Sequence, residues 1–244
     1  MSSLVYTRYE LLRALRNRRF FIFSLAFPLL LYLVIAVPNR GEQDVGDTGV
    51  SAPLYFMVGL VAFAGMVAVL ASGARIAAER TAGWNRQLRL TPLSTRAYFR
   101  TKVITAYLSA LLGIVLLYVA GIALGVRLSA GEWLEMTGLV LLGLLPFAAL
   151  GVLLGHLLTA DSVGPASGAT IGVFALLGGV WFPLGSGVLG DIGRWLPSYW
   201  LVQASRVSLG ESGWGYRGWI VVAVWTLAAS ALAARAYRRD TKRV

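Results

Sequence analysis

The sequence has no cysteine and only one histidine, His156, among its 244 residues. Disulfide bonds, thiolate metal sites and cysteine nucleophiles are therefore excluded, and a single histidine cannot build a histidine-based metal site. Charge is also scarce: 14% of the residues are charged, whereas 57% are hydrophobic and the mean hydropathy is +0.71. A soluble domain of this length could not bury so much apolar surface, so the composition indicates an integral membrane protein.

The apolar residues fall in runs of about 20 with few charges, which is the length of a helix that crosses a bilayer. We therefore expect an all-α membrane protein with six transmembrane helices, forming one domain over residues 1–244. Pro146, within the fourth run, is expected to kink its helix. The expected spans are Phe20–Val37, Pro53–Gly73, Val103–Val126, Gly138–Leu158, Ala166–Leu184 and Gly218–Ala236.

Basic residues are distributed unevenly between the two sides of these spans. With a cytoplasmic N-terminus, 17 of the 22 lysines and arginines fall inside and five fall outside. The positive-inside rule then predicts a multi-pass protein with both termini in the cytoplasm. The basic excess is thereby explained as a topology signal, so no nucleic-acid partner is expected. Twenty arginines against two lysines are typical of a GC-rich bacterial genome, which places the chain in a bacterial plasma membrane.

Residues 1–19 precede the first span and show helical periodicity. Glu10 and Arg13 point away from the apolar stripe, which predicts an amphipathic interfacial helix that leads into the membrane. A solvated, arginine-rich tail is the alternative at this point. The stripe consists of Leu4, Leu11 and Leu15.

The segment between the second and third spans is the longest one expected in the cytoplasm. We expect its helix to continue to about Arg80, to break at Gly83 and to stop finally before Pro92, because the residue before a proline is pushed out of the α region. A short helix before Pro92 would present apolar side chains to a docking partner, and a lipid-facing loop without a partner is the alternative. Those side chains are Trp84, Leu88 and Leu90.

Two sets of residues resemble a known family. Glu79-Arg80, Gly83 and Leu90-Thr91-Pro92-Leu93-Ser94 are similar to the E-R-x-x-G...T-P-L-S signature of the ABC-2 family of ABC-transporter permeases. The sequence departs from the fuller E-R-E form at Thr81. Nearer the C-terminus, Trp181-Phe182-Pro183-Leu184, Leu196-Pro197 and Gln203-Ala204 resemble the F-P...L-P pattern of the same family, and the likeness extends over nearly the whole chain.

The resemblance implies a role for each of these regions. It implies that residues 79–95 form a coupling segment, including a cytoplasmic coupling helix, which docks an ATPase, and that residues 185–217 form re-entrant helices at the outer face. As a permease of this family, the chain would be the transmembrane subunit of an ATP-driven exporter. The implied ATPase-coupling residues are Glu79, Arg80, Gly83, Trp84, Leu88, Leu90, Thr91, Pro92 and Leu93.

The chain has no phosphate-binding loop of the form G-x-x-x-x-G-K-[ST], and its only lysines are Lys102 and Lys242. We therefore expect no enzymatic activity and no cofactor on this chain. ATP and Mg²⁺ would be bound by a separate ABC ATPase subunit, present in two copies. Six spans are half of the twelve that the resemblance implies, so the permease is expected to work as a homodimer or as a heterodimer with a sister permease.

The expected spans hold no carboxylate at mid-membrane depth, which argues against a proton-coupled carrier. With no soluble outer domain to deliver cargo, the sequence favours export of hydrophobic or amphipathic molecules, such as drugs, natural products or lipids. A polysaccharide or glycolipid exporter and a non-transporting membrane scaffold are the alternatives. Aromatic and methionine side chains are candidates for an apolar pathway, with a lipid-facing position as the alternative for each. They are Phe56, Phe63, Met66, Phe174, Trp181 and Phe182.

Glycines recur at a spacing of four in three of the expected spans. Such faces permit helices to approach closely, either within one subunit or, for the fifth span, across a dimer seam. The pairs and series are Gly121 with Gly125, Gly151 with Gly155, and Gly164 with Gly168 and Gly172.

Overall fold

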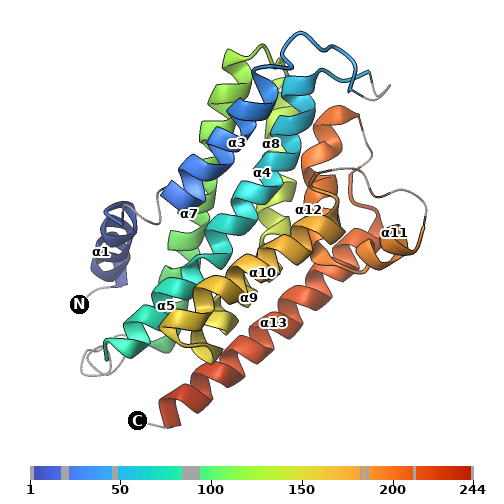
Figure 1. Cartoon of the computed structure of the whole chain (residues 1–244). Helices are drawn as coiled ribbons and strands as arrows, with labels where there is room; N and C mark the ends of the chain where they lie inside the picture. The colour runs from blue at the N-terminus through green and yellow to red at the C-terminus, as the bar shows by residue number, and fades with distance from the viewer. Residues whose placement is uncertain are drawn as a thin grey trace.

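The structure is a computed structural model that describes residues 3–17, 22–45, 49–83, 94–181, 184, 187–210 and 213–242. Every regular element within these residues is a helix, which confirms the predicted all-α class. Figure 1 shows the helices as one elongated bundle with α1 beside it. In chain order they are α1 (Ser3–Leu15), the π-helix η1 (Ile22–Ala26), α3 (Phe27–Ala36), α4 (Ala52–Leu70), α5 (Ser72–Thr81), α7 (Thr95–Ala123), α8 (Ala130–Gly143), α9 (Leu145–Leu157), α10 (Ala160–Gly178), α11 (Val188–Gly193), α12 (Pro197–Arg206), the 3₁₀ helix η3 (Val207–Leu209) and α13 (Tyr216–Lys242).

Five helical stretches in the described part of the chain are long and apolar enough to cross a membrane. They correspond to the second through sixth predicted spans. A shorter apolar helix, Ser24–Ala36, takes the place of the first predicted span, Phe20–Val37, and the residues just before it lie outside the described ones. The sixth crossing therefore stays a prediction. The five stretches are Ala52–Thr81, Ala97–Ala123, Ala130–Leu157, Ala160–Gly178 and Tyr216–Arg239.

The helices of the third, fourth and fifth predicted spans begin before the predicted boundaries, and α10 ends at Gly178 rather than at Leu184. Capping boxes set two of these early starts. The fourth span begins at Ala130 rather than at Gly138: the Ser129 hydroxyl accepts a hydrogen bond from the Glu132 N–H, and the Glu132 carboxylate accepts one from the Ser129 N–H at 2.6 Å. A second capping box, formed by Thr159 and Ser162, starts α10 before the predicted Ala166. A capping box therefore outweighs the hydropathy of the first turn in setting where a helix begins.

The predicted kink at Pro146 is confirmed. Helix α8 ends at Gly143 and α9 begins at Leu145, so the fourth span is built from two helices. Proline lacks an N–H group and its ring crowds the preceding turn, which interrupts the ladder of backbone hydrogen bonds.

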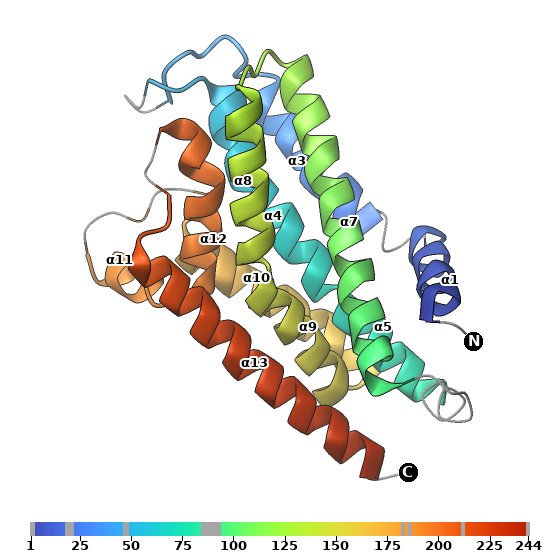
Figure 2. The same ribbon diagram turned by 180° about the vertical axis from the view of Figure 1, so that it is seen from behind.

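Helix α4 is the centre of the bundle. It packs against α3, α7, α9 and α12, and most of its residues are buried, including Met57, Val58 and Met66. In Figure 1 it runs beside α3, and in Figure 2, seen from the other side, it lies behind α7 and α8. By contrast, only 17% of the apolar stretch of α10 is buried, so most of that helix is left to contact lipid or another chain.

Glycine contacts bring α9 close to α5 and to the end of α4. A Cβ atom added at Gly155 would lie 2.7 Å from the carbonyl oxygen of Gly73, and one at Gly151 would lie 2.7 Å from that of Val69. The predicted Gly151 and Gly155 face is thus a packing face within one subunit. By contrast, a Cβ atom added at Gly168, in the α10 series with Gly164 and Gly172, would have no neighbour within 4 Å among the described residues.

One end of the bundle carries the N-terminal helix α1, the C-terminal end of α5, the start of α7 and the C-terminal end of α13 (Figures 1 and 2). We call it the basic end, because Arg13, Arg80, Lys102 and Arg238 belong to these elements. Near the opposite end lie α11 and α12, which follow α10 and precede α13 in the chain. Helix α12 packs against α4, α8 and α10. Entry of these two short helices into the membrane stays a prediction.

Candidate functional site

Glu79, the first residue of the predicted coupling segment, lies in the last turn of α5 and is 1% exposed. Its Oε1 atom accepts a hydrogen bond from Lys102 Nζ at 2.6 Å and one from Arg13 Nη1 at 3.1 Å. Lys102 belongs to α7 and Arg13 to α1. One carboxylate therefore joins the end of the second span to the start of the third and to the N-terminal helix.

Lys102 is the centre of this cluster. It is 2% exposed, and its ammonium group also donates to Glu10 Oε1 of α1 at 2.6 Å. Short, charge-assisted hydrogen bonds of this kind are about twice as strong as neutral ones. A second contact between the same helices is the hydrogen bond of 2.9 Å between the hydroxyls of Thr7 and Thr101. We call Glu10, Arg13, Glu79 and Lys102 the ion cluster.

Three further groups around the ion cluster are affected by its charges and its burial. Burial, together with the carboxylates of Glu10 and Glu79, raises the pKa of Tyr6 in α1 above its ordinary value, so this phenol stays protonated. The second carboxylate oxygen of Glu79, Oε2, is buried without a hydrogen-bond partner among the described residues. Arg75, one turn before Glu79, interacts electrostatically with Glu10 and Glu79. Loss of Lys102 would leave Glu10 and Glu79 buried without the cation that both contact.

The sequence places Glu10 away from the apolar stripe of α1 but does not indicate what this side of the helix meets. In the structure Glu10 is buried together with Tyr6, while Val5 and Leu12 are exposed. The reason is the partner that α1 meets. Lys102 offers a cation that Glu10 can neutralise, so the polar stripe of α1 faces the protein and apolar side chains are left for lipid.

Arg80 anchors α5 on its other side. Its Nη1 atom donates to the carbonyl oxygens of Gly155 at 3.0 Å and Leu158 at 3.1 Å. These carbonyls lie at the C-terminal end of α9, where the backbone acceptors have no partner within the helix and a cation is favourable. Adjacent residues thus hold α5 to different neighbours: Glu79 to α1 and α7, and Arg80 to α9.

The predicted break at Gly83 is observed. Helix α5 ends at Thr81, and Gly83 has a φ of 69°, in the left-handed region that suits glycine at the end of a helix. On the far side of the segment, the Ser94 hydroxyl caps α7 by accepting a hydrogen bond from the Ala97 N–H. The other predicted coupling residues lie outside the described residues, so their coupling role stays a prediction. They are Trp84, Leu88, Leu90, Thr91, Pro92 and Leu93.

Sequence reasoning did not select Glu10 and Lys102 for this site. A usable signal was nonetheless present, because Glu10 and Glu79 are rare acidic residues in segments dominated by arginine, and Lys102 is one of only two lysines. A buried charge requires a partner, so an acid in such a segment indicates an ion pair. The sequence does not specify which of many basic residues supplies that partner.

The predicted pathway residues lie in several separate packing contacts. Phe63 packs against Trp181 at 5.3 Å between ring centroids, and Phe174 packs against Phe147 at 5.2 Å. Met66 is buried in the core, and the partly buried Phe56 packs against this core. Phe182 lies outside the described residues. A pathway formed by these side chains stays a prediction.

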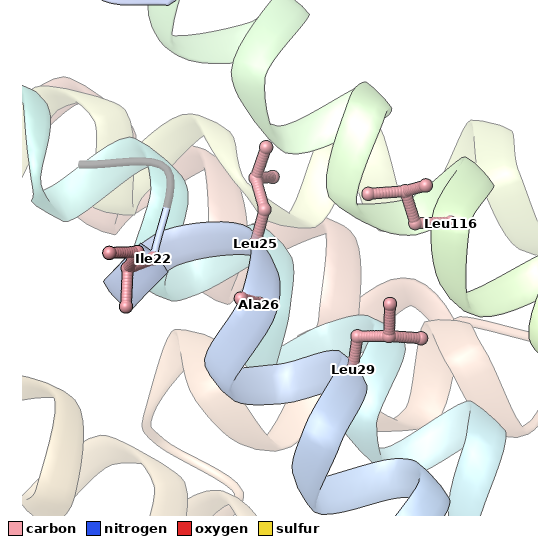
Figure 3. A pocket seen from close by; sticks show the side chains of 5 residues that line it. All are labelled: Ile22, Leu25, Ala26, Leu29 and Leu116. Atoms are coloured by element: carbon pink, nitrogen blue, oxygen red, sulfur yellow. The ribbon is translucent and has the colours of Figure 1, made fainter. Parts of the chain in front are cut away.

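A shallow apolar cavity of about 230 Å³ lies between α7 and the first apolar helix (Figure 3). The close-up shows side chains of η1 and α3 on one side and Leu116 of α7 on the other. None of the predicted pathway residues lines it. The lining residues are Ile22, Leu25, Ala26, Leu29 and Leu116.

Comparison with known proteins identifies the family. Residues 42–235 match the family model described as ABC-2 family transporter protein. The chain is also 32% identical over 195 residues to the putative transport permease YvfS of Bacillus subtilis (strain 168), a match that covers 78% of each protein. The family and this relative indicate a transport subunit rather than an enzyme. The chain therefore belongs to the ABC-2 family, whose members are membrane permease subunits of ABC transporters.

Proposed function

We propose that the chain is the permease subunit of an ATP-driven exporter that moves hydrophobic or amphipathic molecules out of a bacterial cell. In this proposal the basic end faces the cytoplasm, and two permease copies, identical or from sister chains, work with two copies of a separate ABC ATPase. The observation that carries the proposal is the ion cluster, which fixes the end of α5, where the coupling segment begins.

The geometry supports a lever that transmits movement. A push on residues 84–93 reaches α5 at one end and α7 at the other, and the contact between Glu79 and Lys102 ties these two helices together. Arg80 extends the same unit to α9. Nucleotide-driven movement of a docked ATPase would therefore shift the second, third and fourth spans together rather than deform one loop.

The buried position of Glu79 defines its part in this lever. At 1% exposure its carboxylate is not accessible to another protein, so we assign it a positioning role. Contact with the ATPase would then be made by residues 84–93, with Trp84, Leu88 and Leu90 as apolar anchors. Substitutions in the two groups should consequently differ: changes in the anchors prevent assembly, and changes in Glu79 weaken coupling within an assembled complex.

Copurification from native membranes tests assembly. The tagged wild type should retain an ATP-hydrolysing subunit, Leu90→Asp should lose it, and the Glu135→Gln variant, which alters an exposed acid near the opposite end, should retain it. Recovery of a well-folded wild-type permease without any ATPase would contradict the proposal and favour a membrane scaffold. In inverted vesicles with the partner present, ATP-dependent uptake of an amphipathic dye is expected, whereas export of a polymer alone would favour the polysaccharide alternative.

A further inference from the structure

A groove of about 290 Å³ lies between α7 and α13, with α9 as its floor. Ala148, Val152 and Ala233 form its deep part and are each 4% exposed. Leu145, Ser230 and Ala234 line the groove too and are exposed, so the groove opens to the surroundings of the bundle.

The groove exists because α7 and α13 pack on different neighbours. Helix α13 runs along α9, and α7 runs along α4. Small side chains on α9 and α13 leave the space between α7 and α13 unfilled. At the basic end α7 and α13 meet again, since the rings of Phe99 and Tyr237 contact each other at 4.8 Å between centroids.

The dimensions and lining of the groove suit a hydrocarbon chain. The lining residues of α13 extend from Thr226 to Ala234, which corresponds to about 12 Å of helix. One leaflet of a bilayer contributes about 15 Å of hydrocarbon. The Thr226 hydroxyl already donates to the Val222 carbonyl at 2.6 Å, so an apolar occupant would leave it satisfied.

Two arginines flank the closed, basic end of the groove. Arg100 precedes the lining residue Val103 by three positions, and Arg238 follows the lining residue Ala234 by four. Residues at these spacings share a helix face, and both arginines are exposed. Guanidinium groups bind phosphate oxygens in a bidentate manner, and basic pockets between transmembrane helices are suited to anionic headgroups.

We propose that this groove binds an anionic phospholipid, with one acyl chain between α7 and α13 and the phosphate held by Arg100 and Arg238. The proposal goes beyond the transport function, because it requires neither the ATPase nor a cargo.

Native mass spectrometry of the purified permease tests the headgroup contact. In mixed micelles the wild type should retain phosphatidylglycerol in preference to phosphatidylcholine, and Arg100→Gln/Arg238→Gln should lower phosphatidylglycerol binding about 30-fold, since each of the two basic residues near the surface contributes about 1 kcal/mol. The control pair Arg8→Gln/Arg239→Gln removes the same charge from the basic end but lies off the groove, and it should change binding less than twofold. Equal retention of the two lipids by the wild type, or an equal loss in the control pair, would overturn the proposal.

A second pair of variants tests the acyl-chain position. Ala234→Leu fills the groove from an exposed position and should displace the lipid, whereas Ala228→Leu makes the same change at an exposed site of α13 outside the groove. Both variants should elute as folded protein. If Ala234→Leu changed the fraction of dimer and left phosphatidylglycerol binding unchanged, the groove would be an interface between permease copies and the lipid proposal would be wrong.

Discussion

Lys102 Nζ lies 2.6 Å from Glu79 Oε1, although 23 residues separate the two in the chain and one side chain belongs to α7 and the other to α5. Most of the predicted coupling segment lies between them in the sequence. The helices on either side of it, α5 and α7, are thus joined by an ion pair that is almost fully removed from solvent. This contact makes the ends of the second and third spans one mechanical unit.

Removal of Lys102 should destabilise the protein strongly. Lys102→Ala leaves Glu10 and Glu79 buried without their shared cation, and the expected loss is about 3–5 kcal/mol in the free energy of unfolding. Thermal unfolding in detergent measures it. Lys242→Ala, a change in the only other lysine, should have little effect.

A compensated variant separates charge from packing in the same cluster. Lys102→Met combined with Glu10→Gln removes one charge of each sign, leaves Glu79 paired with Arg13 and near Arg75, and keeps side chains of similar size, so it should be more stable than Lys102→Ala. A combined variant that unfolds as early as Lys102→Ala would show that shape, not charge balance, determines stability at this site.

The contact of Arg80 with α9 should depend on the geometry of the guanidinium group. Arg80→Ala removes hydrogen bonds to two backbone carbonyls, and hydrogen bonds to charged groups contribute about 1.5–3 kcal/mol each. Arg80→Lys should recover only part of the stability, because an ammonium group does not reproduce the planar fork. Thermal unfolding of both variants is the measurement. Arg194→Ala, which breaks an exposed pair with Asp191, should cost less than about 1 kcal/mol.

The glycines of the α5 and α9 crossing should tolerate no side chain. Gly155→Ala places a Cβ atom 2.7 Å from a backbone carbonyl, and overpacking of this kind costs about 1–3 kcal/mol. Gly168→Ala has open space and a better helix propensity, so it should be neutral or slightly stabilising. Unfolding temperatures of the two variants should therefore move apart, and a similar loss in both would contradict the close crossing.

The open glycine face of α10 tests the proposed dimer. Gly168→Leu should weaken association of permease copies while each copy remains folded, because the glycine face of α10 has no neighbour within 4 Å among the described residues. Size-exclusion chromatography with multi-angle scattering measures the dimer fraction, with Ala228→Leu as the control. An unchanged dimer in Gly168→Leu would place the seam elsewhere.

The elements that were predicted from the sequence are those determined by local properties. Apolar runs located the spans, Pro146 located a kink, and Gly83 located the end of α5. The sequence placed the start of α8 too late, because the hydropathy window averaged over the cap formed by Ser129 and Glu132.

The ion cluster was not predicted because it depends on distant pairing. Glu10 and Lys102 are 92 residues apart, and helical periodicity divides α1 into two faces without stating which face meets α7. The apolar stripe predicted an interfacial helix but not the protein partner of its polar side. In a membrane protein the lipid can take the apolar face, so the polar face of α1 was free to pack on a buried cation.

The ATPase activity of the reconstituted transporter, measured with and without an amphipathic cargo, tests the central claim most directly. Glu79→Gln should assemble with the ATPase and keep its basal rate, but its cargo stimulation should fall about 5-fold or more, as expected for the loss of a coupling free energy of 1 kcal/mol or above. Glu135→Gln should behave as the wild type. Full stimulation in Glu79→Gln, in a complex shown to be intact, would contradict the role of the ion cluster in coupling.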